Sequence, residues 1–319
     1  FFLGGPAIQR VIWRVSGGEE VTVNQLVAGE ADATETVFNP AALDLLDQQD
    51  GLRLQPYPAP AYGYIAFNFV DPTDQSAPHP LFTDRSIRRA IATAINRSDI
   101  LSAVFGNRGY EPIGATGRAV WIWTDSIAQL PYDTAAARAL LDGAGWVDSD
   151  GDGIRDLAGR PLSFRLLVPS SSGARRQSAV IVQEQLARIG VEVSISELEF
   201  NTFLERALQG DFDAVFGAFA LDPSPRGITQ LWTEQGIGSN NWGRYSNDQV
   251  NELVLHALRA PDVETSTRRW HEVLVALNDD VPAVWLFEPR LTAVIASRFS
   301  GVVLRPDQWA SNIWRWTVN

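Results

Sequence analysis

One short acidic loop carries the clearest chemical signal in the sequence. Its acidic side chains occupy positions 1, 3, 5 and 9 of a twelve-residue pattern with Gly153 at position 6, which is the arrangement that calcium loops use. The candidate ligands are Asp148, Asp150, Asp152, the carbonyl of Ile154, and Asp156. Position 12, where such loops supply a Glu, holds Gly159. A structural calcium site and a charged, solvated turn both stay open, and no required cofactor is indicated.

The rest of the sequence offers no catalytic constellation. The 3 His residues are scattered, and although His271-Glu272 opens like a zinc-protease helix, Val275 stands where the second His would be required. Neither a nucleophile elbow nor a phosphate-binding glycine loop occurs in the chain. These residue types favour a binding protein over an enzyme.

Aromatic side chains outside the periodic segments indicate a ligand-binding surface. Several of the 11 Trp residues lie in passages rich in Gly, Pro or Asn, namely Trp121, Trp123, Trp232 and Trp242. Each could instead pack in a core, but as a set they favour an aromatic-lined cleft. The loop over 236–243 adds Asn240 and Asn241, whose amides can donate and accept, and glycines that allow a ligand to approach the backbone.

Composition limits the possible partners. A net charge of -12 and a pI near 4.7 argue against nucleic acid, because its binding relies on cationic surfaces. With 319 residues and 45% hydrophobic side chains, the chain can bury one large core or two medium ones. No apolar run approaches the roughly 18 residues of a membrane span. Because Phe1 is not an initiator Met, we expect a leader and further sequence before it.

The first part of the chain alternates between strand and helix patterns. We expect strands over 11–15 and 52–54, and helices over 20–28 and 40–48. A Pro-rich passage follows, and then an apolar strand over 62–69. The order predicts an α/β fold with a domain boundary at the Pro-rich passage.

The middle of the chain gives the clearest helix signals. Ile87, Ile91 and Ile95 are spaced one helical turn apart. Ser98 is suited to cap a second helix that begins at Asp99. This region therefore predicts two consecutive helices.

The second half of the chain predicts a β-α-β-α-β order. Asp133 is expected to cap a helix over 134–142, which Gly143 ends. Strands and helices then alternate over 163–168, 175–189, 191–196, 202–209 and 213–219. This order implies a mostly parallel sheet, in which ligands bind at the carboxyl ends of the strands. Helices over 248–259 and 266–279 and strands over 281–287, 291–295 and 313–318 complete the expected elements.

Several passages carry residue patterns that go beyond secondary structure. The most diagnostic runs from Phe82-Thr83-Asp84-Arg85-Ser86-Ile87-Arg88 to Ile95-Asn96-Arg97. The others are Leu3-Gly4-Gly5-Pro6, Gly29-Glu30-Ala31-Asp32, Tyr64-Ile65-Ala66-Phe67-Asn68, Tyr132-Asp133 with Gly145-Trp146, Gln183 to Val191, and Gly210-Asp211-Phe212-Asp213. In this order they resemble the solute-binding proteins that feed peptide, nickel and oligosaccharide ABC importers.

The resemblance implies a two-lobed, periplasmic-binding-protein-like α/β architecture of type II, cluster C. Its sheets would be mixed and mostly parallel, and two hinge strands would cross between the lobes at Tyr64 to Phe69 and Val284 to Phe287. Residues 1–62 with 287–319 would form part of lobe I, and 63–286 would form lobe II. The remainder of lobe I would precede Phe1.

The resemblance also implies a set of ligand-binding residues. Counted without gaps from Phe212-Asp213, Asp222 stands where family members place the aspartate that pairs with a peptide's ammonium group. Alignment of the following Pro moves Leu221 there, and an ordinary Asp-Pro turn is the structural alternative. Phe216 stands where some members have an Arg for the peptide carboxylate. The full candidate set is Asp222, Phe219, Asn68, Trp121, Trp123, Asn240, Asn241 and Trp242.

By the same resemblance, the protein is expected to be the substrate-binding component of an ABC importer. It would capture a small solute, an oligopeptide in the first place, and deliver it to a membrane permease. An oligosaccharide or other solute, and a sensory role without transport, are the alternatives. We expect a monomer that binds no nucleic acid and works in the periplasm or outside the cytoplasm, with a lipid anchor in the portion before Phe1.

Overall fold

The computed structural model describes residues 5–106 and 108–319, so Leu3 and Gly4 of the Gly-Gly-Pro passage lie outside the described residues. The chain divides into two compact units, Phe1–Pro60 with Pro289–Asn319 and Ala61–Glu288, called unit 1 and unit 2 below. The expected domain boundaries lie two residues from these. Among the described residues, no helix is both long and apolar enough to cross a membrane.

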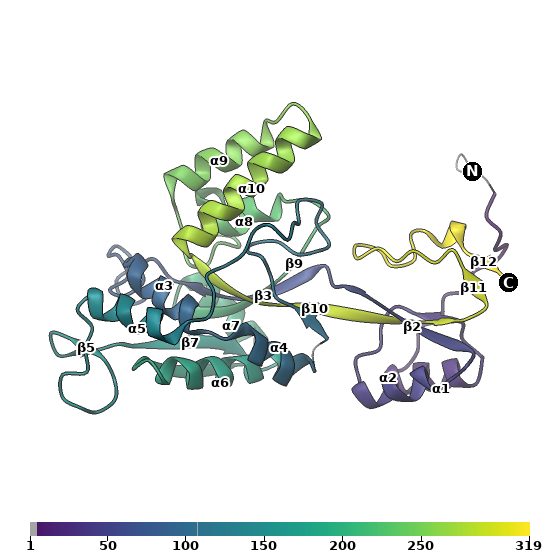
Figure 1. Ribbon diagram of the computed structural model, residues 1–319, viewed down its shortest axis with the longest axis horizontal. Helices are drawn as coiled ribbons and strands as arrows, with labels where there is room; N and C mark the ends of the chain where they lie inside the picture. The colour runs from purple at the N-terminus through teal and green to yellow at the C-terminus, as the bar shows by residue number, and fades with distance from the viewer. Residues whose placement is uncertain (1–4, 107) are drawn as a thin grey trace. The chain divides into compact units, whose positions relative to one another are not determined.

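Unit 1 is a small α/β structure (Figure 1). Its main elements are α1 Glu19–Val27, β1 Ala33–Thr34, α2 Pro40–Asp47, β2 Leu52–Pro58 and the second half of β10 Ala283–Ala296. Both β1 and β2 pair antiparallel with β10. Leu26, Leu43 and Leu46 form a core with Val294 of β10. The helices thus cover this strand because their apolar side chains recur at helical spacing.

Two expected strands of unit 1 are corrected by the structure. Residues 11–15 form neither helix nor strand, and Trp13 is 65% exposed with its ring edge-to-face against Trp309. An apolar run becomes a strand only when a partner strand pairs with it, and the described part of unit 1 provides none here. The segment 313–318 contains a 3-10 helix, Ile313–Arg315, and only the short strand β12 Thr317–Val318, which pairs with β11 Phe299–Ser300.

Unit 2 is built on a mixed sheet. Its strands, in spatial order, are the first half of β10, then β3 Ala61–Phe67, β9 Ala214–Ala220, β7 Ser163–Pro169 and β8 Glu192–Leu198. The β7–β8 and β7–β9 pairs are parallel, as the β-α-β-α-β order predicts. The β3–β9 and β10–β3 pairs are antiparallel. The sheet is therefore mixed, but its parallel part is smaller than expected.

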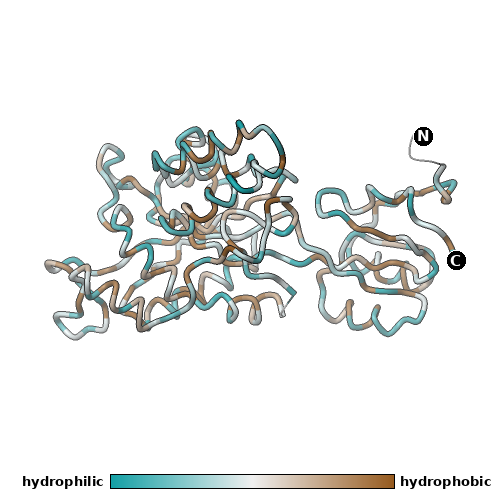
Figure 2. Tube along the Cα trace, turned by 45° about the horizontal axis from the view of Figure 1, so that its top comes forward, coloured by the Kyte–Doolittle hydropathy of each residue, from teal (hydrophilic) through white to brown (hydrophobic). Residues whose placement is uncertain are grey.

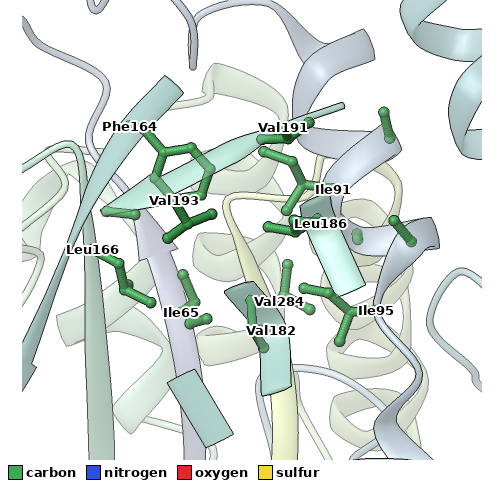
Figure 3. Packing of buried hydrophobic residues seen from close by; sticks show 14 of the residues in the cluster. Ile65, Ile91, Ile95, Phe164, Leu166, Val182, Leu186, Val191, Val193 and Val284 are labelled. Atoms are coloured by element: carbon green, nitrogen blue, oxygen red, sulfur yellow. The ribbon is translucent and has the colours of Figure 1, made fainter. Parts of the chain in front are cut away.

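Alternation along these strands sends side chains to two separate cores. On β3, Ile65 packs into one core while Tyr64 packs into the other, and on β10 Val284 and Trp285 divide in the same way. Figure 3 shows the first core, where Ile65, Leu166 and Val284 meet Ile91 and Leu186. Figure 2 shows the corresponding hydrophobic stretches in the interior of unit 2, with hydrophilic turns around them. Both faces of the sheet are therefore covered.

Helices provide the outer layers of both cores. The first core takes side chains from α3 Arg85–Ala94, α4 Arg97–Phe105, α5 Thr134–Gly143 and α6 Gly173–Ala187. The second takes them from α7 Phe200–Gln209, α8 Gly227–Trp232, α9 Asp248–Leu258 and α10 Val263–Asp280. Figure 1 shows α9 and α10 on one side of the strands and α6 on the other. Unit 2 also contains three strands of two residues each, β4 Gly109–Tyr110, β5 Asp156–Leu157 and β6 Arg160–Pro161.

Helix capping confirms one prediction and corrects another. Asp133 caps α5, since its carboxylate accepts from the N–H groups of Ala135 and Ala136. The cap of α4 is Asn96 and not Ser98, because the Asn96 side chain accepts from the backbone N–H of Ser98, which already lies inside the helix. Both residue types cap helices well, so spacing alone did not separate them.

Two glycines on the central strands each face an aromatic ring. Gly217 on β9 lies directly opposite Tyr64 on β3, and a Cβ at Gly217 would come within 2.4 Å of that ring. Gly63 on β3 lies opposite Phe287 on β10, and a Cβ there would come within 2.3 Å of the ring. Each ring therefore occupies the space of its neighbour's missing side chain.

A single strand, β10, replaces two expected ones. We expected strands over 281–287 and 291–295, but β10 is continuous over Ala283–Ala296, with a bulge between Trp285 and Phe287. The polar Glu288-Pro289-Arg290 passage resembles a turn in sequence. It stays extended because the antiparallel partner changes from β3 to β2 without a break in the backbone.

Candidate functional site

Asn68 lies away from the loop that follows β9. Tyr62 is the residue of β3 opposite Phe219, and Asn68 follows it by six positions, which separates the two ends by roughly 20 Å. The Asn68 side chain is fully buried and donates to the carbonyls of Gly210 and Phe212, at 3.0 and 2.8 Å. Its amide thus holds the start of β9 in place, and the structure does not bring it together with Phe219.

Asn241 is also occupied within the fold. Its amide donates to the carbonyls of Thr233 and Tyr245, and its oxygen accepts from the N–H of Tyr245. Asn240 is half-buried and donates to the side chain of Gln230 at 3.2 Å. Trp242 packs edge-to-face on Phe203. Of this loop's candidates, Asn240 is the one whose polar atoms remain open to solvent.

Trp121 and Trp123 differ in their surroundings. Trp121 is 46% exposed, whereas the ring of Trp123 packs against the second core and faces the guanidinium of Arg118, whose Cζ lies 4.2 Å from the ring centroid. The same Cζ also lies 4.4 Å from the ring centroid of Tyr110. One of the predicted tryptophans, Trp123, therefore shares a cation with Tyr110, and we call Arg118, Tyr110 and Trp123 together the Arg118 clamp.

The two alternatives for the ammonium-binding position, Asp222 and Leu221, lie in different surroundings in the loop after β9. Asp222 is exposed, and no hydrogen bond of its side chain occurs within the described chain. Leu221 is half-buried and lies against Gly117, because a Cβ at Gly117 would fall 2.8 Å from Leu221 Cδ1. Phe219 packs beside the second core and lies against Gly227, where a Cβ would fall 2.9 Å from Phe219 Cε1. Asp222 is thus the free carboxylate of this loop.

Phe216 does not extend toward this loop. Its side chain is fully buried in the first core, with its ring centroid 6.2 Å from that of Phe287. Arg175 reaches the same residue from α6, since its Nη1 donates to the Phe216 carbonyl at 3.3 Å. Burial lowers the pKa of the Arg175 guanidinium. An Arg at position 216 would therefore have to leave the core to meet a ligand.

A buried carboxyl beside the Arg118 clamp was not predicted. Glu288 ends unit 2 and is fully buried, and its Oε1 accepts from the backbone N–H of Arg118 at 2.6 Å. Its Oε2 lies 4.0 Å from Nε of Arg118. Burial raises the pKa of Glu288 from 4.5 to about 7, and the N–H bond and charge of Arg118 oppose this rise only in part.

Gly117 lies between the Arg118–Glu288 pair and the loop after β9. A Cβ at Gly117 would lie 3.3 Å from the Glu288 carboxyl and 2.8 Å from Leu221. The Arg118 clamp, Glu288 and the residue before Asp222 therefore meet around one glycine. No sequence pattern indicates this site, because 170 positions separate Arg118 from Glu288 and neither residue lies in a recognisable motif.

The acidic loop has the geometry of an Asp-rich turn. Carboxylate oxygens of Asp148, Asp150 and Asp152 lie within 4.8 Å of one another, and all three residues are exposed. These carboxylates accept backbone N–H bonds inside the loop, for instance from Gly151 to Asp148 at 2.8 Å and from Ile154 to Asp152 at 2.7 Å. Asp156 instead binds Ser149, which lowers its pKa. The cluster contains three of the five predicted ligands, the Asp156 carboxylate accepts from Ser149 instead, and calcium binding stays a prediction.

Comparison with known proteins identifies the family. A model described as "Bacterial extracellular solute-binding proteins, family 5 Middle" matches residues 2–240. The chain belongs to this family of extracytoplasmic binding proteins, as the ordered motifs predicted.

Individual relatives agree with this assignment. The chain is 27% identical over 322 residues to the oligopeptide-binding protein AppA of Bacillus subtilis, a match that covers 99% of this chain and 57% of the relative. The structure of AppA in complex with a nonapeptide matches with a TM-score of 0.73 and 25% identity, over 94% of this chain and 58% of that one. HbpA2 from Haemophilus parasuis matches with a TM-score of 0.85 and 19% identity, over 100% of this chain and 60% of that one. The expected periplasmic-binding-protein-like fold is therefore confirmed, and the chain spans somewhat more than half the length of these relatives.

Proposed function

We propose that the full-length protein is the substrate-binding component of an ABC importer and that its solute is an oligopeptide. The observation that carries this proposal is the 27% identity along almost the whole chain to an oligopeptide-binding protein, whose own solved structure holds a nonapeptide. A binding role also fits the chemistry, since aromatic rings, a free carboxylate at Asp222 and the Arg118 clamp are groups that orient a ligand without reacting with it.

In this proposal unit 2 is the ligand-binding lobe and unit 1 is part of the other lobe. Ligand would bind at the carboxyl-end loop of β9, where Phe219 and Asp222 lie. Trp121, Asn240 and Trp242 are proposed as further contacts. The protein would act as a monomer outside the cytoplasm, held by a lipid anchor, and pass its solute to a membrane permease.

Native mass spectrometry of the gently purified full-length protein tests the proposal. The expected result is a co-purified or added oligopeptide at a ratio of one per protein. Mixtures of random tripeptides to pentapeptides and of oligosaccharides would be offered in parallel. Capture of oligosaccharides alone, or of neither mixture, would contradict a peptide-binding function.

A further inference from the structure

We propose that Arg118 is a ligand-binding residue that recognises a carboxylate of the solute, and that Glu288 positions it. This inference rests on the proposed solute-binding function and names one chemical group that the solute must carry. It concerns the Arg118 clamp, formed by Arg118, Tyr110 and Trp123, together with the buried carboxyl of Glu288.

The guanidinium of Arg118 differs from those of the buried arginines of unit 2 in having free donors. Arg88 donates to four backbone carbonyls and to Asp280, and Arg97 donates to the carbonyls of Trp285 and Leu130 and to Gln129. Arg118 makes a hydrogen bond only through its backbone N–H within the described chain. The N–H groups of a half-buried guanidinium normally donate hydrogen bonds, so we infer that those of Arg118 bind an acceptor outside the described chain.

Two aromatic rings pack against the guanidinium but offer it no conventional hydrogen-bond acceptor. Tyr110 and Trp123 contact the guanidinium at 4.4 and 4.2 Å from its Cζ, distances at which a ring faces the cation. A guanidinium carries its N–H donors in its own plane, where a carboxylate can accept two parallel hydrogen bonds. The side chain remains 29% exposed, so a ligand can reach part of it.

Glu288 does not satisfy the cation. Its Oε2 is 4.0 Å from Nε of Arg118, beyond hydrogen-bond length, and neither of these buried atoms has a hydrogen-bond partner among the described residues. Burial favours the neutral carboxyl, which raises the pKa of Glu288 to about 7 and leaves the charge of Arg118 incompletely balanced. Arg118 is the charged group that faces Glu288 among the described residues. The firm contact is the 2.6 Å bond from the Arg118 backbone, which holds the residue in place.

Further unpaired atoms lie in the same segment. Oγ1 of Thr116 and Nε1 of Trp123 are also buried without a hydrogen-bond partner within the described chain. Through Gly117, this segment contacts Leu221, the neighbour of the exposed Asp222. The segment therefore supplies donors for an anionic group next to a loop that supplies a free carboxylate. A small zwitterion such as a peptide has both complementary groups.

The test compares free and amidated peptides. Full-length wild type and the Arg118→Gln variant are offered an equimolar mixture of random tripeptides with free carboxylates and the same mixture as C-terminal amides, and the captured species are counted by native mass spectrometry. Wild type is expected to favour the free acids by roughly tenfold or more, since a bond to a charged group contributes that much. Arg118→Gln is expected to reduce this ratio to about one while still capturing amides.

Two controls separate a binding role from a structural one. Arg176→Gln removes an exposed arginine of α6 that pairs with Glu197 on the surface and should keep the wild-type ratio. Arg118→Lys retains the charge without the bidentate edge and should give an intermediate ratio. An unchanged acid-to-amide ratio in Arg118→Gln would overturn this inference alone. Failure of wild type to capture either mixture would overturn the proposed peptide function as well.

Discussion

The carboxyl of Glu288 accepts a 2.6 Å hydrogen bond from the backbone of Arg118, a residue 170 positions earlier in the chain. This bond places a fully buried acid beside a cation that two aromatic rings hold. The pair connects the end of unit 2 to the segment that reaches the loop after β9. Its contribution to stability and its proposed role in binding can be measured separately.

The pH dependence of stability follows from Glu288. Its pKa rises from 4.5 to about 7 on folding, so between these values the folded state keeps a proton that the unfolded state has released. This contribution is fully present below pH 4.5 and is lost as the pH rises through about 7. Glu288→Gln mimics the protonated form, so the variant should exceed wild type by roughly 3 kcal/mol at pH 8 and match it near pH 4.5. Urea unfolding at both pH values measures the difference, and an equal pH dependence of the two proteins would contradict the assignment.

Asn241 and Asn240 form a matched pair for separating structural from ligand-binding roles. Asn241→Ala leaves three backbone groups of the loop without partners and should lower the free energy of unfolding by roughly 2–3 kcal/mol. Asn240→Ala removes one exposed bond and should change it by less than about 0.5 kcal/mol. Chemical denaturation of both variants provides the measurement. Similar losses in the two would show that the loop is not held by Asn241.

His79 is expected to act in folding and not in binding. It is buried, its Nε2 lies 3.1 Å from Asp213, and its Nδ1 accepts from the N–H groups of Leu81 and Phe82. The acceptor role of Nδ1 places the proton of the neutral ring on Nε2. His79→Ala should therefore cost roughly 3 kcal/mol of stability, whereas the exposed His256 can be replaced by Ala at less than about 0.5 kcal/mol. Thermal melts followed by circular dichroism compare them, and a neutral His79→Ala would refute the structural role.

Calcium addition decides between the two interpretations of the acidic loop. If the clustered Asp148, Asp150 and Asp152 hold the ion, calcium at about 100 times its Kd should stabilise the protein by roughly 2.7 kcal/mol. Asp150→Asn should weaken that effect, and EDTA should reverse it in wild type. Magnesium at the same concentration is the control, because it demands stricter octahedral geometry. An unchanged melting temperature in calcium and in EDTA would identify the loop as a solvated turn.

Local signals along the chain predicted most elements of unit 2, because caps and periodic apolar residues act over a few positions. Asp133, for example, caps α5 as expected, and the helix expected over 202–209 ends at Gln209. The prediction of a strand over 11–15 was wrong because strand formation depends on a distant partner strand, which local composition does not reveal. The continuous β10 was missed for the same reason, since pairing with β2 keeps the polar Glu288-Pro289-Arg290 passage extended.

The candidate site was less predictable than the fold. The family resemblance pointed to the loop after β9, and the structure leaves Asp222 exposed there. It did not reveal that the amides of Asn68 and Asn241 are bonded internally. Nor could spacing indicate Arg118 or Glu288, because their relationship depends on the folded path of the chain and on burial of a carboxyl that looks like the polar end of a strand.

The ring-over-glycine pairs on the central strands have an evolutionary consequence. Gly217 with Tyr64, and Gly63 with Phe287, each share one space between two positions on neighbouring strands. A side chain gained at either glycine is compatible with the sheet only if the facing ring becomes smaller at the same time. The four positions are therefore expected to change in pairs among homologues, and such covariation would report strand register without any structure.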